Sequence, residues 1–174
     1  MDELVELGCT KATLLGKEIY LMDMSKDGIA YADFRHNAIL FNRDAFNKIS
    51  KRELSYKEEI YLNELLAHEN EHLLRGAYNV SVSDCTSINK LVKLYIDEEQ
   101  IINKKVAPNM YATYNELIAS KDPDTMRQVE INGVLGAVST IANCDTLLNN
   151  LNLSEGMIDH INSVKKGLIE RGEE

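Results

Sequence analysis

The hydrophobic residues of this chain recur mostly at helical spacing, and the strongest amphipathic stretch covers residues 55–76. Its broad apolar face is made of Ile60, Leu62, Leu65, Leu66, Leu73 and Leu74. Ser55 can cap this helix because Glu58, three residues later, completes a capping box, and Gly76 ends it. The segment is therefore predicted to be one long helix.

A second long amphipathic helix is predicted over residues 84–106, and Pro108 closes it. The rest of the chain also has helical periodicity, in segments at about 109–120, 124–148 and 154–171. The sequences "KDPD" and "NLSEG" separate these segments. The small residues Gly133, Gly136 and Ala137 are expected to permit close packing of the middle segment against a neighbouring helix.

The N-terminal part of the chain mixes two periodicities. Residues 2 to about 22 predict an amphipathic helix, which Gly8 and Gly16 weaken. After a break at "SKDG", the runs "IAYADF" and "AILFN" are rich in β-forming residues and predict a hairpin near residues 29–41. A short helix, "RDAFNKIS", follows. The expected fold class is α+β: mostly helical, with a small β-hairpin, a central helix pair and a helical C-terminal third.

The composition limits which kinds of protein this chain can be and which kinds of partner it can bind. With 44% hydrophobic and 27% charged residues the chain is an ordinary soluble globular protein. A net charge of −9 argues against nucleic acid as a main partner, because phosphate binding needs clustered Lys and Arg. No apolar run approaches the roughly 20 residues that cross a bilayer, so no membrane association is expected. Three widely spaced cysteines and an acidic N-terminus without a secretory pattern predict a cytoplasmic location, in a cell or in the host of a phage.

The sequence "ELLAHENEHLLRG" places His68 and His72 four residues apart in the first long helix. Residues at this spacing share one helix face, so both imidazoles can bind the same ion. Zn²⁺ favours nitrogen ligands, and catalytic zinc sites use three protein ligands and a water. Glu69 lies about 100° around the helix from His68. Its carboxylate can accept a proton from that water, whose pKa the metal lowers. The spacing thus predicts two zinc ligands and a catalytic base.

The alternative is a chance match on a solvated helix face. A His-Glu-x-x-His pattern arises by accident in about 1 in 200 chains of this size, usually without a helical context or a third ligand. Here the pattern lies in mid-helix between apolar flanks, after a predicted hairpin, which favours the metal site. The spare histidines are weaker third ligands than an acid: His36 is expected in a turn, and His160 at a buried or edge position of a helix.

The third ligand is expected in "YIDEEQIIN" on the second long helix, where Asp97, Glu98 and Glu99 stand in an apolar frame. Glu99 is favoured because Asn103, four residues on, lies on the same helix face. The amide of Asn103 can hydrogen-bond a ligand imidazole, as the outer partners of metal-binding histidines usually do. Asp97 and Glu98 stay open as ligands, although solvated charge is the simplest role for both.

These segments resemble the gluzincin branch of the zincin metallopeptidases, in which a glutamate on a following helix completes the metal site. In order, "GIAYADFRHNAILFN", "LLAHENEHLLRGA" and "YIDEEQIIN" are similar to minimal metallopeptidase-like domains of bacteria and their phages. The resemblance covers about residues 28–106 and, aligned on Asn103, implies Glu99 as the acidic ligand. Glu71 stands where many relatives have an apolar or small residue, and this extra acid is expected to face solvent or a partner.

The resemblance implies a zincin-like core at residues 1–107 and a helical C-terminal extension, residues 108–174, packed on that core. It also implies hydrolysis of an extended peptide, with the second hairpin strand, about Ala38 to Asn42, as the edge that pairs with substrate backbone. A donor to the oxyanion is implied as well. The sequence leaves that donor open among Tyr95, Tyr111, Tyr114, Arg75 and His160.

Three hypotheses follow. The first is a zinc-dependent metallopeptidase that acts on a peptide or protein substrate, with His68, His72 and Glu99 as ligands and Glu69 as the base. The second is a zinc-binding interaction protein without activity, encoded by a phage, that binds a host protein through its acidic surface. The third is a helical binding module without a metal. The sequence favours the first.

Overall fold

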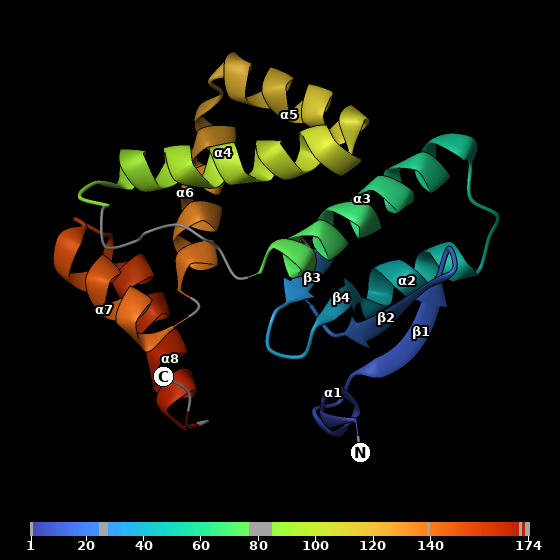
Figure 1. The fold of residues 1–174 in the computed structure, drawn as a ribbon, viewed down its shortest axis with the longest axis horizontal. Coiled ribbons are helices and arrows are strands. Elements are labelled where there is room, and N and C mark those ends of the chain that lie inside the picture. The colour runs from blue at the N-terminus through green and yellow to red at the C-terminus, as the bar shows by residue number, and fades with distance from the viewer. Residues whose placement is uncertain (1, 25–27, 77–84, 139, 171, 173–174) are drawn as a thin grey trace. The chain divides into compact units, whose positions relative to one another are not determined.

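The computed structural model describes residues 2–24, 28–76, 85–138, 140–170 and 172 (Figure 1). It shows an α+β protein, in which a mixed β-sheet is followed by a mostly helical region. The predicted fold class is confirmed.

The strands of the described residues are β1 (Thr10–Leu14), β2 (Lys17–Met22), β3 (Ala30–Asp33) and β4 (Ala38–Asn42). The helices are α1 (Glu3–Glu6), α2 (Arg43–Ser50), α3 (Tyr56–Arg75), α4 (Ile88–Val106), α5 (Pro108–Ser120), α6 (Pro123–Ala137), α7 (Ile141–Asn150) and α8 (Glu155–Glu170). All of these strands precede α2, so the sheet is built from the N-terminal segment of the chain.

The chain divides into two compact units. The first contains Met1–Ala77 and Ile102–Ala112, and the second contains Tyr78–Ile101 and Thr113–Glu174. Helices α4 and α5 each contribute residues to both units. A division into a core at 1–107 and an extension at 108–174 stays a prediction.

The helix predicted for residues 2–22 is wrong, because only the short α1 forms and β1 and β2 follow it as a hairpin. Gly8 follows α1 with a φ of 94°. The two residues between the strands, Leu15 and Gly16, have φ values of 49° and 77°. Positive φ at both central positions gives a turn whose twist suits a tight hairpin. The two glycines that weaken the predicted helix are thus the residues that end α1 and reverse the chain.

The sheet has the order β1-β2-β4-β3, with β2 and β4 parallel and the other pairs antiparallel. The β3–β4 hairpin confirms the prediction near residues 29–41. The prediction that Ala38–Asn42 is an edge strand is wrong, because β4 pairs with β2 on one side and β3 on the other. The unexpected strand β2 covers that edge, and β3 is the edge strand at this end of the sheet.

Helix α3 forms at the predicted position and has the predicted ends. The Ser55 hydroxyl accepts a hydrogen bond from the backbone N–H of Glu58 at 3.2 Å. The Glu58 carboxylate accepts one from the backbone N–H of Ser55, also at 3.2 Å, so the capping box is confirmed. Gly76 ends the helix with a φ of 86°. Within the first unit, α3 packs against β3 and β4 (Figure 1).

The C-terminal helices differ from prediction at two places. Helix α4 begins at Ile88, whereas the helix was predicted from residue 84, which lies outside the described residues. The helix predicted for 124–148 is divided into α6 and α7. Thr140 begins the second of these helices as its N-cap, because its side chain accepts a hydrogen bond from the backbone N–H of Asn143 at 3.1 Å. The breaks at "KDPD" and "NLSEG" are confirmed.

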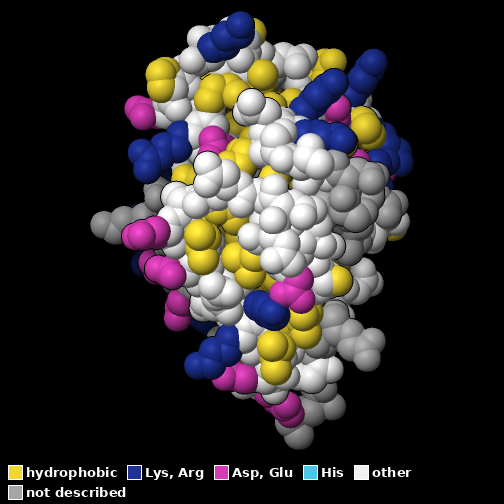
Figure 2. All heavy atoms as spheres, turned by 90° about the vertical axis from the view of Figure 1, so that its left-hand side faces the viewer, with side chains coloured by type: hydrophobic (Ala, Val, Ile, Leu, Met, Phe, Trp, Pro, Cys, Tyr) yellow, Lys and Arg dark blue, Asp and Glu magenta, His cyan; other side chains and the backbone are white. Residues whose placement is uncertain are grey.

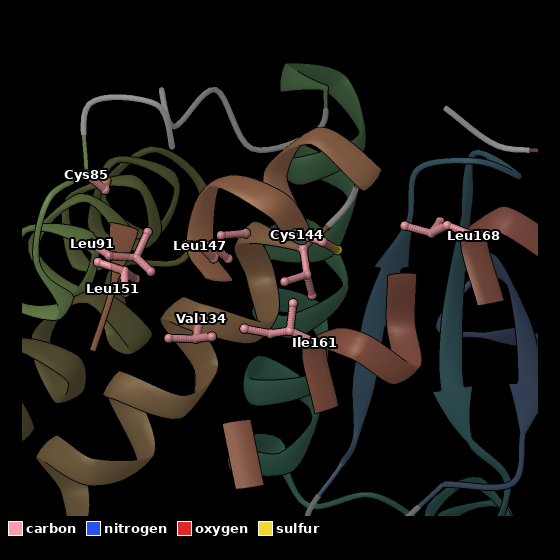
Figure 3. Packing of buried hydrophobic residues seen from close by; sticks show 10 residues of the cluster. Cys85, Leu91, Val134, Cys144, Leu147, Leu151, Ile161 and Leu168 are labelled. Carbon is pink, nitrogen blue, oxygen red and sulfur yellow. The ribbon is translucent and has the colours of Figure 1, made fainter. Parts of the chain in front are cut away.

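Each unit has its own hydrophobic core. In the first unit, the sheet and α3 contribute Leu14, Ile19, Leu21, Ile39, Phe41, Leu62, Leu65 and Leu66. In the second, α4, α6, α7, α8 and residues beside them contribute the cluster shown in Figure 3, which includes Val134, Cys144 and Ile161. A Cβ at Gly133 would lie 3.4 Å from the Cβ of Tyr95. This distance confirms the close helix packing predicted at Gly133.

The molecular surface carries both signs of charge. On the face shown in Figure 2, Lys and Arg side chains gather towards the upper end and Asp and Glu side chains along the left edge and the lower end. Hydrophobic side chains lie between them in short patches. No helix of the described residues combines the length and the apolar character needed to cross a membrane.

Candidate metal centre

The imidazoles of His68 and His72 converge on one point. Both residues lie on the buried face of α3, with relative exposures of 4% and 7%. Their Nε2 atoms are 3.1 Å apart. Two nitrogens that each bind zinc at ~2.0–2.1 Å with a tetrahedral angle are ~3.3 Å apart. The pair is therefore already spaced as two ligands of one ion.

Glu99 is the third member of a group that could hold a metal ion. One ligand atom from each of His68, His72 and Glu99 lies within 4.8 Å of the other two, and Glu99 is half-buried on α4. Two imidazole nitrogens and one carboxylate oxygen are a donor set that zinc binds in catalytic sites. Within the described residues this is the one such group of histidine, cysteine and acidic side chains. The group fits a divalent metal ion, and the ion's identity is left open by the donor set.

Asn103 orients the first histidine. Its Oδ1 atom lies 2.7 Å from Nδ1 of His68, and its side chain is 2% exposed. An amide oxygen only accepts hydrogen bonds, so Nδ1 of His68 donates in this contact, and Nε2 is the ring nitrogen that faces His72. The contact that the sequence predicted between Asn103 and a ligand imidazole is present. Its contribution to metal binding stays a prediction.

Glu69, the predicted base, is half-buried on α3, one residue after His68. Of the two acids that directly precede Glu99 on α4, Asp97 is exposed and Glu98 is half-buried. Glu99 is the member of that acidic run that takes part in the metal-binding group. The role of Glu69 stays a prediction.

Two buried carboxylates on α3 were not predicted from the sequence. Glu64 is 8% exposed and accepts hydrogen bonds from the backbone N–H groups of Asn109 and Met110, at 3.0 and 3.1 Å. It thereby satisfies donors at the start of α5 that have no partner within that helix. Glu71 is 4% exposed and lies 2.6 Å from Nζ of Lys105. The expectation that Glu71 faces solvent or a partner protein is therefore wrong, because this acid is buried and paired within the chain.

The signal for Glu64 and Glu71 was present but ambiguous. Glu64 stands four residues before His68, and Glu71 one residue before His72, so both lie close to the histidine face. An acid there is solvated in most helices, and only the neighbouring helices α4 and α5 bury it. Phe34, in the hairpin turn, was also missed; its ring meets the ring of His72 edge-on, with centroids 6.4 Å apart.

The predicted oxyanion donors lie in different environments. Tyr95 is half-buried on α4 and packs beside Gly133, and Tyr111 is half-buried on α5. Arg75 is exposed at the end of α3. His160 is exposed on α8, so the prediction of a buried or edge position is wrong. His36 lies in the β3–β4 turn, as predicted, with Nδ1 2.7 Å from Asp33.

Tyr114 is distinct among these donors. Its hydroxyl is buried and has no hydrogen-bond partner among the described residues. Burial, and then the negative charge of Glu99, raise the pKa of this tyrosine, so the hydroxyl keeps its proton. Asn115, the next residue on α5, accepts a hydrogen bond of 2.7 Å from Gln100, the residue after Glu99. This bond joins α5 to the turn of α4 that carries Glu99.

No protein-family model, curated protein or solved structure matches the chain. The gluzincin resemblance therefore rests on the quoted motifs and on the His68, His72 and Glu99 group alone. What that arrangement can do chemically follows from its donors. It can bind a divalent cation. The carboxylate of Glu69 lies on the same helix as the two histidines of the group.

Proposed function

We propose that this protein is a zinc-dependent hydrolase of peptide bonds. The observation that carries the proposal is the convergence of the Nε2 atoms of His68 and His72, 3.1 Å apart, in a group that also contains Glu99. A bound Zn²⁺ would lower the pKa of a coordinated water and polarise the substrate carbonyl. His68, His72 and Glu99 would hold the ion, and Asn103 fixes the tautomer of His68.

Glu69 would act as the general base. Its place directly after His68 puts its carboxylate about 100° around α3 from the first ligand, beside the metal-facing side of the helix. A carboxylate there accepts a proton from the attacking water and passes it to the leaving amine. Glu69 is half-buried in the structure.

The edge strand β3 is the proposed site for the substrate backbone. It pairs with β4 on one side, and no strand of the described residues pairs with its other side. An extended peptide can add to such an edge through main-chain hydrogen bonds. Phe34, directly after β3, contacts the ring of His72 and so links this edge to the metal centre. Tyr31 of β3 is 49% exposed and available to a substrate side chain.

The metal dependence is the direct test. Protein purified without a histidine tag is expected to carry about one zinc per chain, because such a site binds its metal tightly. It should cleave members of a peptide library, lose this activity when a chelator removes the metal, and regain it when zinc is returned. Elemental analysis and mass spectrometry of the products measure both parts. A chain that takes up no zinc contradicts the proposal. Zinc uptake with no cleavage of any peptide favours the zinc-binding interaction protein.

Tyr114 is the proposed donor to the oxyanion, because its buried hydroxyl lacks a partner among the described residues. The change Tyr114→Phe is expected to lower kcat about 10²- to 10³-fold, the usual loss when one oxyanion donor is removed. KM and zinc content should stay near the wild-type values. Tyr111→Phe, on the same helix, is the matched control and should keep its activity. Equal rates for Tyr114→Phe and wild type would exclude this role.

A further inference from the structure

The ion pair between Glu71 and Lys105 has an unusual position. The Glu71 carboxylate is buried, one residue before His72, whereas Lys105 is an exposed lysine two residues after Asn103. The Nζ atom of Lys105 lies 2.6 Å from Oε1 of Glu71. Ion pairs between two exposed side chains contribute little to the stability of a fold, because water screens their charges. Here the carboxylate is withdrawn from water, so losing its partner leaves an uncompensated buried charge.

This pair adds a polar contact between α3 and α4 to the one that joins His68 to Asn103 at 2.7 Å. One contact fixes a point on α4, about which the helix can still pivot. A second contact, two residues along, removes that freedom. At ~1.5 Å of rise per residue, Lys105 lies ~3 Å from Asn103 along the axis, and Glu99 lies ~6 Å from it in the opposite direction. A pivot that displaces Lys105 by ~1 Å would therefore displace Glu99 by ~2 Å.

We propose that Glu71 and Lys105 are positioning residues, and that their ion pair sets the register of α4 on α3 so that Glu99 meets the metal. This inference rests on the proposed metal site. Metal–ligand distances tolerate deviations of only about 0.2 Å, far below the displacement that the pivot would allow. Neither residue contacts the metal in this proposal. Each acts through the backbone of the helix that carries a ligand.

The test is a zinc titration against a competing chromophoric chelator, with the full chain. Lys105→Met keeps the length and the apolar stem of the lysine but removes its charge. We expect its Kd for zinc to rise about 10-fold or more, within the 10- to 100-fold range for residues that support metal ligands. Lys105→Arg restores the charge and should lie within about threefold of wild type. The neighbouring exposed residue gives the matched control, Lys104→Met, which should bind zinc as wild type does.

Thermal unfolding of the metal-free proteins separates positioning from folding. A positioning role predicts that Lys105→Met loses zinc affinity even at a temperature where its metal-free form is fully folded. If Lys105→Met does not fold, Glu71→Gln, which keeps the volume of the side chain, is titrated in its place with the same expectation. Wild-type affinity in the folded variant would overturn the proposal. A wild-type chain that binds no zinc would instead overturn the metal site, and zinc binding without peptide cleavage would overturn only the proposed activity.

Discussion

Glu69→Gln is expected to lower the rate of peptide hydrolysis about 10²- to 10⁴-fold while the zinc stays bound. The amide has nearly the same shape as the carboxylate but cannot take a proton from water. General acid–base catalysis contributes roughly 10²- to 10⁴-fold to the rate. A loss of this size in kcat corresponds to about 3–5 kcal/mol of transition-state stabilisation. Zinc content should stay at about one per chain, because His68, His72 and Glu99 are unchanged. Elemental analysis together with product formation from a cleaved peptide measures both quantities.

The matched control for this change is Glu59→Gln. Glu59 lies on the same helix, is exposed, and points away from the histidine face. Its change to Gln is therefore the same chemical substitution at a position outside the proposed site. It should leave hydrolysis and zinc content as they are in wild type. Full activity in Glu69→Gln would rule out this residue as the base. A parallel loss of zinc would instead mean that Glu69 supports the metal site.

The second large effect is expected for Glu99→Ala, which removes one of three protein ligands. Structural zinc sites with four ligands bind with about 10–16 kcal/mol, or roughly 2.5–4 kcal/mol per ligand. Losing one such ligand corresponds to a rise in Kd of about 10²- to 10³-fold. Activity should fall with metal occupancy and recover only in part at high zinc. Competition with a chromophoric chelator, followed by peptide cleavage at saturating zinc, measures the two effects.

Asp97→Ala and Glu98→Ala are the internal controls for Glu99→Ala. Asp97 is exposed and Glu98 half-buried, and neither joins the group with the two histidines. Both variants should retain zinc within a few-fold of wild type. If Glu98→Ala proves the more sensitive variant, the third ligand is displaced by one residue from Glu99.

Much of the metal centre could be predicted from the sequence because it depends on helical periodicity. The four-residue spacing of His68 and His72 fixes their common face before any packing occurs. Likewise, the spacing of Glu99 and Asn103 places both on one face of α4. The capping box at Ser55 and the stop at Gly76 are also local features, and the structure confirms both.

The errors arose where long-range pairing overrides a local pattern. Residues 10–22 have enough apolar positions to suggest a helix, yet they form two strands because Leu15 and Gly16 reverse the chain and β2 pairs with β4. That pairing also moved the sheet edge from β4 to β3. No local pattern contains this information, since strand neighbours are decided by segments that are distant in sequence.

The sequence by itself determined the four-residue spacing of the two histidines, their shared helix face, the glutamate that follows the first of them and the acidic run on the following helix, because these depend only on the geometry of an isolated helix. The tertiary structure decided which acid of that run joins the histidines, which strand forms the sheet edge, and that Glu64 and Glu71 are buried partners of α5 and α4. These features depend on how helices and strands pack, and packing places a side chain in water or in the interior whatever its local pattern.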